Sequence, residues 1–167
     1  MRIMTEQNLR DAFSGESQAH MKYQIYSAVA EKEGYPNVAR LFRAIAHAEL
    51  VHARNHLREL GGINDSVANL QDAYDGETFE IEEMYPAYKV VAELQEEKGA
   101  IRSTHYALEA EKIHAQMYDA SKKTVMERGD ITSGAIQICD VCGYTHDGDA
   151  PDKCPVCNAP KSKFLSF

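Results

Sequence analysis

Apolar residues recur every three or four positions along most of the first part of the chain. Residues 8–33 carry such a stripe without a proline, and residues 36–60 carry another that stops at the Gly61-Gly62 pair. This spacing places apolar side chains on one face of a helix, and glycines commonly end helices. Because the two segments are separated by so short a connection, we expect them to form an antiparallel helical hairpin.

Residues 61–77 break this periodicity, because they are rich in Asn, Asp, Ser, Gly and Gln and contain only scattered apolar residues. The composition predicts an irregular crossover connection. A third helix is predicted over residues 78–97, with Pro86 in its early turns, and a fourth over residues 100–128. The pattern therefore predicts an all-α four-helix bundle.

The last part of the chain changes character, since turn-forming residues and cysteines replace the apolar stripes. We expect a helical domain over residues 1–130, a linker over 131–137 and a small C-terminal domain over 138–167. A piece of about 30 residues is too small to build its own hydrophobic core, so a bound metal is expected to hold it together.

The two helical halves resemble each other. Aligning residues 31–34 (Glu-Lys-Glu-Gly) with residues 96–99 (Glu-Glu-Lys-Gly) brings Tyr23 onto Tyr88. This alignment requires a gap of three residues before the Glu-x-x-His steps of the two halves coincide. We interpret the halves as two related hairpins.

Two Glu-x-x-His steps, Glu49/His52 and Glu111/His114, each place both side chains on one helix face. Apolar residues flank them, so these charges fall where the core is expected. Burying several carboxylates without cations is very costly, which favours a metal pair. Known two-metal bundles use one Glu from each of two helices and a Glu-x-x-His from each of the other two. The remaining candidates are Glu16 on the first helix and Glu80 or Glu83 on the third, with Tyr23 and Tyr88 within two turns of a ligand as hydrogen-bond or proton donors.

All four cysteines lie in two Cys-x-x-Cys pairs, Cys139/Cys142 and Cys154/Cys157. Eleven residues separate the pairs, a plan that gives tetrahedral sulfur coordination of zinc or of a single iron. Gly143-Tyr144 after the first pair and the proline inside the second resemble rubredoxin, whose backbone amides donate hydrogen bonds to the sulfurs. Thiolates and carboxylates favour different metals, so the chain is predicted to carry two kinds of metal site.

The chain has 26 acidic and 18 basic residues and a formal charge of −8. No Lys/Arg cluster forms a phosphate-binding stripe, which argues against a nucleic-acid partner. No secretory signal and no apolar run long enough to cross a bilayer is present, so no membrane association is expected. We expect a cytoplasmic protein with a small or uncharged substrate.

Taken together, these features resemble the rubrerythrin family, in which a ferritin-like di-iron bundle precedes a rubredoxin-like domain. The resemblance implies that Glu49 and Glu111 bridge two non-haem irons and that His52 is a switching ligand that replaces Glu83 on reduction. It implies further that Glu16 and Glu83 terminate one iron, and Glu80 and His114 the other. The matching segments are residues 15–17, 48–52, 80–86, 111–114 and the two cysteine pairs.

The resemblance also implies an activity. Members of the family are peroxide reductases that protect against oxidative stress, with electron transport from a reductase or rubredoxin through the cysteine-bound iron. They form homodimers in which the cysteine-bound iron of one subunit lies near the di-iron site of the other. We therefore expect a non-haem di-iron peroxidase acting on hydrogen peroxide. The alternatives are a ferroxidase that handles iron, and a non-enzymatic binding protein with a zinc ribbon.

Overall fold

A computed structural model describes the whole chain, residues 1–167. The chain divides into two compact units, Met1–Asn64 and Asp65–Phe167, which we describe separately. The first unit contains only helices. The second contains helices and a small three-stranded sheet that carries the cysteines.

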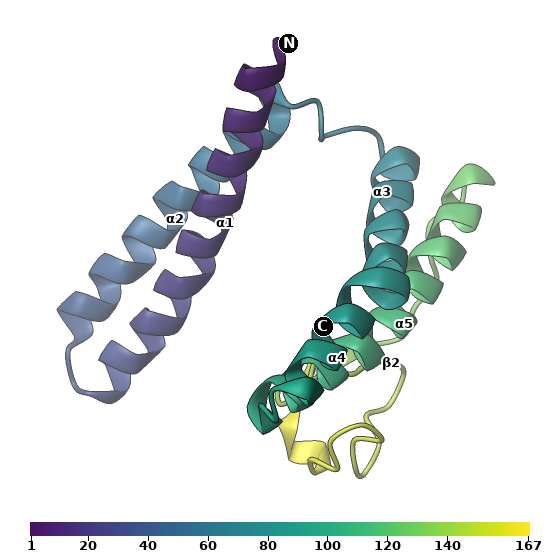
Figure 1. Ribbon diagram of the computed structural model, residues 1–167. Coiled ribbons are helices and arrows are strands. Elements are labelled where there is room, and N and C mark those ends of the chain that lie inside the picture. Colours follow the sequence, from purple (N-terminus) through teal and green to yellow (C-terminus); the bar gives the residue numbers. More distant parts are fainter. The chain divides into compact units, whose positions relative to one another are not determined.

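The first unit is a helical hairpin of α1 (Ile3–Lys32) and α2 (Pro36–Glu59), which lie side by side (Figure 1). Gly34 makes the turn in the left-handed region, with φ of 82°, and the proline at the start of α2 supplies a preset helical φ. Both predicted helices are confirmed, although α1 begins five residues earlier than the predicted residue 8.

Small residues allow the two helices of this hairpin to approach closely. Ala39, Ala46 and Ala53 recur every seven positions along α2, and all three are buried. Ser27 on α1 is buried against them, and its hydroxyl donates a hydrogen bond of 3.0 Å to the Ala39 carbonyl. A seven-residue spacing returns to the same helix face, so this alanine stripe is the contact surface with α1.

The helices of the second unit differ from the prediction at their start. The segment 61–77, predicted as an irregular connection, is largely helical, because α3 spans Ser66–Phe79. The Asp65 carboxylate caps this helix by accepting a 2.9 Å hydrogen bond from the Ala68 amide. The prediction was wrong because composition outweighed a sparse apolar stripe at residues 67, 70 and 74, which has helical spacing.

The chain then passes through a π-helical segment, η1 (Glu80–Met84), into α4 (Tyr85–Leu94). The amide of Tyr85 donates to the Glu80 carbonyl, five residues back, as a π-helix requires. Pro86 follows directly and has no amide to donate, so a widened turn at this point accommodates its ring. Helix α5 (Lys98–Met126) returns alongside α3 and α4 and confirms the predicted fourth helix.

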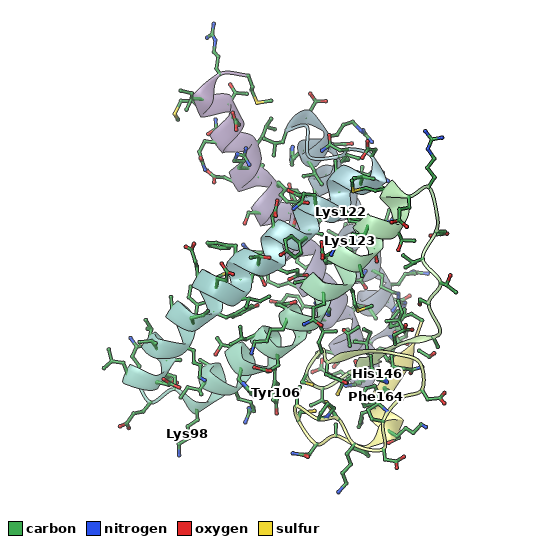
Figure 2. All side chains as sticks on the ribbon, turned by 90° about the vertical axis from the view of Figure 1, so that its right-hand side faces the viewer. Lys98, Tyr106, Lys122, Lys123, His146 and Phe164 are labelled. Carbon is green, nitrogen blue, oxygen red and sulfur yellow. The ribbon has the colours of Figure 1, made fainter.

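The C-terminal module is an antiparallel sheet in the order β2-β1-β3, formed by β1 (Ile136–Cys139), β2 (Thr145–Asp147) and β3 (Phe164–Ser166). A short 3-10 turn, η2 (Lys161–Lys163), precedes β3. The first strand begins inside the segment predicted as a linker. Three buried cysteines form the core of the module, and Tyr106 of α5 packs against them together with Tyr144 and Phe164. Tyr106 and Phe164 are labelled in Figure 2.

The fold class is confirmed as mostly helical with a small C-terminal cysteine module. None of the helices combines the length and the apolar character needed to span a membrane.

The alanine stripe gives a test of the hairpin. Replacing Ala46, which has 0% of its surface exposed, with leucine should lower the free energy of unfolding, because the added side chain cannot fit between the helices. The expected loss is about 1–3 kcal/mol, measured by urea unfolding. The matched control is Ala44→Leu, at an exposed position of the same helix, which should change the free energy by less than about 0.5 kcal/mol. Equal losses in both variants would contradict the close packing.

Candidate metal centres

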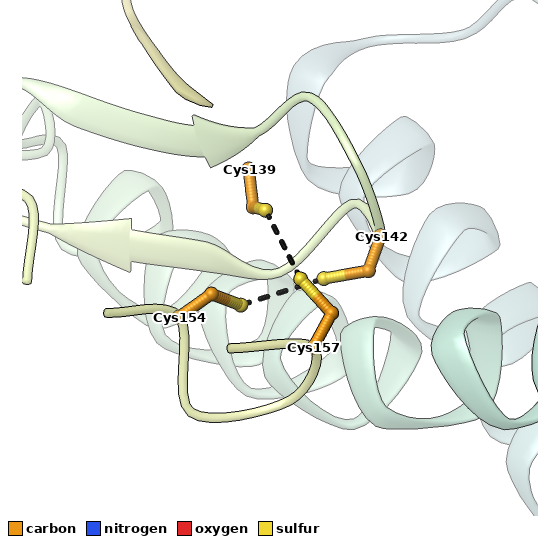
Figure 3. Close-up of side chains that lie close together, drawn as sticks. All are labelled: Cys139, Cys142, Cys154 and Cys157. Atoms are coloured by element: carbon orange, nitrogen blue, oxygen red, sulfur yellow. Dashed lines mark hydrogen bonds between the residues drawn. The ribbon is translucent and has the colours of Figure 1, made fainter. Parts of the chain in front are cut away.

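The four cysteine sulfurs point toward one common centre (Figure 3). The Sγ atoms of Cys139 and Cys157 are 3.6 Å apart, and those of Cys142 and Cys154 are 3.5 Å apart. A disulfide would bring two sulfurs to about 2.0 Å. Four sulfurs at about 2.3 Å from a central metal would be about 3.8 Å from one another, so the observed arrangement fits tetrahedral metal ligation.

Matching backbone turns place the sulfurs. Gly143 follows the first cysteine pair and Asn158 follows the second, and both have positive φ, 79° and 60°. Their amides donate to the carbonyls of Cys139 and Cys154, each at 2.9 Å. The two cysteine pairs therefore form equivalent knuckles that face each other.

The surroundings of the sulfurs favour ligation of a cation. Burial raises the pKa of the Cys142 thiol. Burial acts in the same direction at Cys154, but the backbone N–H groups of Cys157 and Val156 donate to its sulfur and hold its pKa below the ordinary value. Four thiolates in a buried cluster repel one another, and a central metal ion removes that cost.

In the first unit, α1 and α2 bring together Glu16, Glu49 and His52, all three predicted as ligands. His52 Nδ1 is 2.9 Å from an oxygen of Glu49 and 3.8 Å from one of Glu16. The carboxylates are half-buried, and the His52 side chain is 53% exposed within this structure. The Glu-x-x-His step and a facing carboxylate thus form a three-donor cluster that could hold a metal ion.

The second unit contains a cluster with the same geometry, formed by Glu77, Glu111 and His114. His114 Nδ1 is 2.6 Å from an oxygen of Glu111 and 3.7 Å from one of Glu77. The last two residues were predicted as ligands, whereas Glu77 was not. It lies on α3, inside the segment predicted to be irregular.

The two clusters are related by an internal repeat. Sixty-two positions separate Glu49 from Glu111 and His52 from His114, and 61 separate Glu16 from Glu77. The difference of one residue is what a π-helical turn adds to a helix, and η1 lies between Glu77 and the rest of the repeat. Glu77 is therefore the counterpart of Glu16.

The turns of the two units confirm this register. The Tyr35 amide donates to the Ala30 carbonyl, and 62 residues further on the Glu97 amide donates to the Ala92 carbonyl, each at 2.9 Å. Gly34 and Glu96, both with positive φ, also coincide. The alignment proposed from the similar Glu/Lys/Gly segments was wrong by three residues.

The corrected register changes the tyrosine pairing. Tyr23 corresponds to Tyr85, and Tyr26 to Tyr88. Burial raises the pKa of Tyr85, and the charges of Glu80 and Glu111 raise it further, which places this phenol beside the carboxylates. Tyr88, the predicted proton donor, is 55% exposed, and its ring contacts that of Tyr85 edge-on. The two Tyr-x-x-Tyr steps, 62 residues apart, are the sequence signal that could have revealed the register.

The two predicted third-helix carboxylates occupy different positions. Glu80 lies one turn after Glu77 and is half-buried, and burial together with the charge of Glu111 raises its pKa. Glu83 is exposed within its unit. The structure therefore groups Glu77 and Glu80 around Glu111 and leaves Glu83 outside this group.

The carboxylates of the second unit repel one another. Burial raises the pKa of Glu77 to about 7, and the negative charge of Glu111 adds to the effect. The hydrogen bond to Glu111 raises the pKa of His114, although burial opposes this. A divalent cation would take the place of these protons, because carboxylate oxygens and an imidazole nitrogen are donors that iron accepts. The residues present fit a di-iron site.

The fold and these donor sets define a non-haem metalloprotein with a carboxylate–histidine site in its helices and a four-sulfur site in its C-terminal module. A family model described as rubrerythrin matches residues 7–122, and one described as the rubredoxin-like domain of rubrerythrin matches residues 137–165. The chain belongs to the rubrerythrin family. Its metal centres are accordingly a di-iron site and a rubredoxin-like iron site.

Relatives match the chain over almost its whole length. Rubrerythrin-2 of Clostridium acetobutylicum is 44% identical, with 98% of this chain and 97% of the relative covered. Nigerythrin of Nitratidesulfovibrio vulgaris is 34% identical, with 98% and 86% covered. A solved structure of nigerythrin in a mixed-valence state shares 31% identity with a TM-score of 0.57 and covers 98% of this chain and 86% of the nigerythrin chain.

The raised pKa values predict how the stability of metal-free protein depends on pH. A carboxyl whose pKa rises from 4.5 to about 7 on folding stabilises the fold below pH 4.5, and this contribution is lost as the pH rises toward 7. The raised pKa of His114 acts in the same direction, through and above pH 6.5. The thermal midpoint of metal-free protein should therefore fall between pH 5 and pH 8, and Glu77→Gln should flatten this fall. A slope unchanged by Glu77→Gln would contradict the clustering.

Glu77 and Glu83 can be compared directly as ligands. Glu77→Ala should weaken metal retention by the helical site by at least about tenfold, because it removes a carboxylate that faces His114. Glu83→Ala is the matched control and should retain metal. The measurement is the iron content of protein loaded anaerobically and then dialysed. Loss of iron in Glu83→Ala alone would return the ligand role to Glu83.

Proposed function

We propose that the protein is a peroxide reductase that converts hydrogen peroxide to water and protects against oxidative stress. The observation that carries this proposal is the contact between two metal sites of different chemistry. The rubredoxin-like module packs against α5, the helix that bears Glu111 and His114. A redox centre beside a carboxylate–histidine site supports electron delivery to the helical site.

The overall reaction is the reduction of one peroxide by two electrons and two protons to two water molecules. The bound irons supply redox chemistry at the helical site, while the chain provides ligation, orientation and protons. We propose that Glu49 and Glu111 are shared ligands, with Glu16 and Glu77 as their facing carboxylates. The other proposed ligands are Glu80, Glu83, His52 and His114.

Tyrosines beside the carboxylates are the proposed proton donors. Tyr85 lies within the field of Glu80 and Glu111, which keeps its phenol protonated at neutral pH. Tyr23 is its counterpart in the first unit, where its ring packs against Tyr26 and Phe42. A phenol held neutral in this way could donate a hydrogen bond and a proton to peroxide as the peroxide is reduced. Tyr88 is a second neighbour of this group through its contact with Tyr85.

The cysteine site is proposed to relay electrons. Its four sulfurs complete a tetrahedral ligand set and leave no position for a substrate. It therefore passes one electron at a time, and two transfers are needed for each peroxide. The proposed donor is a reductase or a rubredoxin, and the proposed setting is a cytoplasmic homodimer.

Two other functions would require only part of these features. A ferroxidase would use the carboxylate–histidine set to oxidise ferrous iron but would have no use for an attached sulfur site. A zinc-ribbon binding protein would fill the cysteine cluster but would not need the repeated Glu, Glu and His sets. Metal analysis separates the zinc-ribbon protein from the peroxidase, because the peroxidase requires about three irons per chain. A measurement of assembly size separates the ferroxidase, because iron storage requires a shell-forming assembly.

The test of the proposed function is the rate at which reduced protein is oxidised. Anaerobically reduced protein mixed with one equivalent of peroxide should oxidise faster than the same protein mixed with air-saturated buffer, as followed by visible absorption. Cys154→Ser is the control for the relay. It should abolish turnover driven by an external reductase while leaving the single oxidation of a chemically reduced helical site. Oxidation by air that is as fast as oxidation by peroxide would overturn the assignment.

A further inference from the structure

Helix α3 carries Glu77 and has to be held against α5, which carries Glu111 and His114. Tyr74 lies three residues before Glu77, which is about 4.5 Å along the helix axis. A movement of this part of α3 along α5 would carry the Glu77 carboxylate away from His114 Nδ1, from which it is 3.7 Å. The contacts that fix α3 on α5 next to Glu77 therefore help to set the geometry of the metal site.

Lys122 extends from α5 to two residues of α3. Its Nζ donates a hydrogen bond of 2.6 Å to Gln71 Oε1 and lies 5.5 Å from the centre of the Tyr74 ring. Nζ is also 3.5 Å from Asp119 Oδ1 on its own helix. The Lys122 side chain is 18% exposed, whereas that of the next residue, Lys123, is 68% exposed, and both lysines are labelled in Figure 2. A cation buried to this extent requires partners, and two of the three partners of Lys122 belong to α3.

The side-chain amide of Gln71 has a hydrogen-bond partner at each end. Lysine can only donate hydrogen bonds, so the amide oxygen faces Lys122 and the amide nitrogen faces away from it. The nitrogen donates a 2.7 Å hydrogen bond to Asp75 Oδ1, one turn further along α3. Because both ends of the amide are engaged, Gln71 is held in one orientation, and the part of α3 that lies opposite Lys122 is held with it.

The first unit lacks this contact. In the register of the repeat, the counterparts of Gln71, Tyr74 and Lys122 are Arg10, Phe13 and Leu60. The arginine of this set pairs with Glu6 of its own helix at 2.7 Å, and the leucine has no charge. The helices of the two units also differ, because η1 interrupts the regular helix after Glu77, whereas α1 is continuous through Glu16. The segment that bears Glu77 therefore needs a contact of its own with α5.

We propose that Lys122 is a positioning residue of the helical metal site. It holds Gln71 and the ring of Tyr74 against α5 and so sets the position of Glu77 beside His114. This role rests on the ligand role proposed above for Glu77. It does not depend on which oxidant the site reduces.

The sign of the effect on metal binding separates position from charge. A positive charge repels a metal cation, so removal of the Lys122 charge alone would strengthen metal binding at the helical site. Removal of a positioning contact has the opposite effect, because Glu77 is then no longer held beside His114. Weaker metal binding in a variant without the Lys122 charge is therefore an effect of position.

The first experiment measures the affinity of the helical site for cobalt(II). Cobalt is titrated into the full chain, whose cysteine site already holds zinc, and binding is followed by visible absorption. Lys122→Met removes the ammonium and keeps an unbranched side chain, and it should weaken cobalt binding by about 10–100-fold. Lys123→Met is the matched control, because Lys123 pairs with Asp119 of its own helix, and it should leave the cobalt affinity unchanged. Unchanged affinity in Lys122→Met would overturn the proposal.

The second experiment tests whether Lys122 acts through Glu77. Glu77→Ala removes the carboxylate that Lys122 is proposed to position, so Lys122→Met should weaken cobalt binding no further when it is added to Glu77→Ala. Effects that act through one shared group are not additive. A general loss of stability would instead weaken the site by the same factor with and without the Glu77 carboxylate. Equal factors in the two backgrounds would therefore contradict the positioning role.

Gln71→Leu decides the question if Lys122→Met does not fold. This variant removes the hydrogen-bond acceptor on α3 and leaves the Lys122 charge in place, so a change in charge cannot explain its effect. It should weaken cobalt binding, and the loss should disappear in the Glu77→Ala background. A Gln71→Leu protein that binds cobalt as tightly as wild type would then overturn the proposal.

The two proposals can fail separately. If reduced wild-type protein is not oxidised faster by peroxide than by air, the proposed function fails, but the cobalt affinities still test Lys122. If wild-type protein passes the peroxide test and Lys122→Met binds cobalt as wild type does, only the role of Lys122 is overturned.

Discussion

The central constraint on this protein is the gathering of like charges where burial disfavours them. Glu77 and Glu111 share one cluster, where burial raises the pKa of Glu77 to about 7 and the negative charge of Glu111 adds to the effect. Four thiols share another, in which burial raises the pKa of Cys142. Bound cations would favour the loss of protons from such groups, because a positive charge offsets both burial and repulsion. Both the carboxylate cluster of the helices and the small cysteine module therefore depend on a bound cation in place of protons.

Internal repetition explains the form of the helical site. Each unit presents a Glu-x-x-His step opposite a carboxylate, so the two halves have the same local geometry. They are not identical, because η1 contains one extra residue. Residues before η1, such as Glu77, are therefore 61 positions from their counterparts, whereas residues after it are 62 positions away. The widened turn begins at Glu80, one turn after Glu77, and adds a second carboxylate near Glu111 on one side only. A single inserted residue therefore makes a symmetric pair of hairpins chemically asymmetric, which is typical of π-helical turns at functional sites.

Local patterns were sufficient to predict part of this molecule. The Glu-x-x-His steps and the cysteine pairs are fixed by spacing within one turn or one knuckle, so their grouping could be foreseen. Helix α3 was missed because its polar composition outweighed a sparse apolar stripe, and Glu77 was missed with it. The register of the repeat was misplaced because the two similar Glu/Lys/Gly segments meet the structural turn at different points: Gly34 ends the first segment, whereas Glu96 begins the second. The contact between His114 and Thr145 could not be foreseen, since the two are 31 residues apart and only the docking of the module on α5 brings them together.

Helix α5 contacts both the carboxylate cluster and the cysteine module, through different residues along its length. Glu111 and His114 point to the carboxylate cluster, while Tyr106, Ala110 and the far nitrogen of His114 contact the cysteine module. His114 belongs to both faces, since an imidazole has two nitrogens on opposite sides of one rigid ring. The same ring therefore contacts the carboxylates through Nδ1 and Thr145 of the module through Nε2. Gly143 lies where the module meets α5, and its φ of 79° is the reason for a glycine there: a Cβ would touch Ala110 at an ordinary contact distance of 3.8 Å, but a side chain would strain the turn.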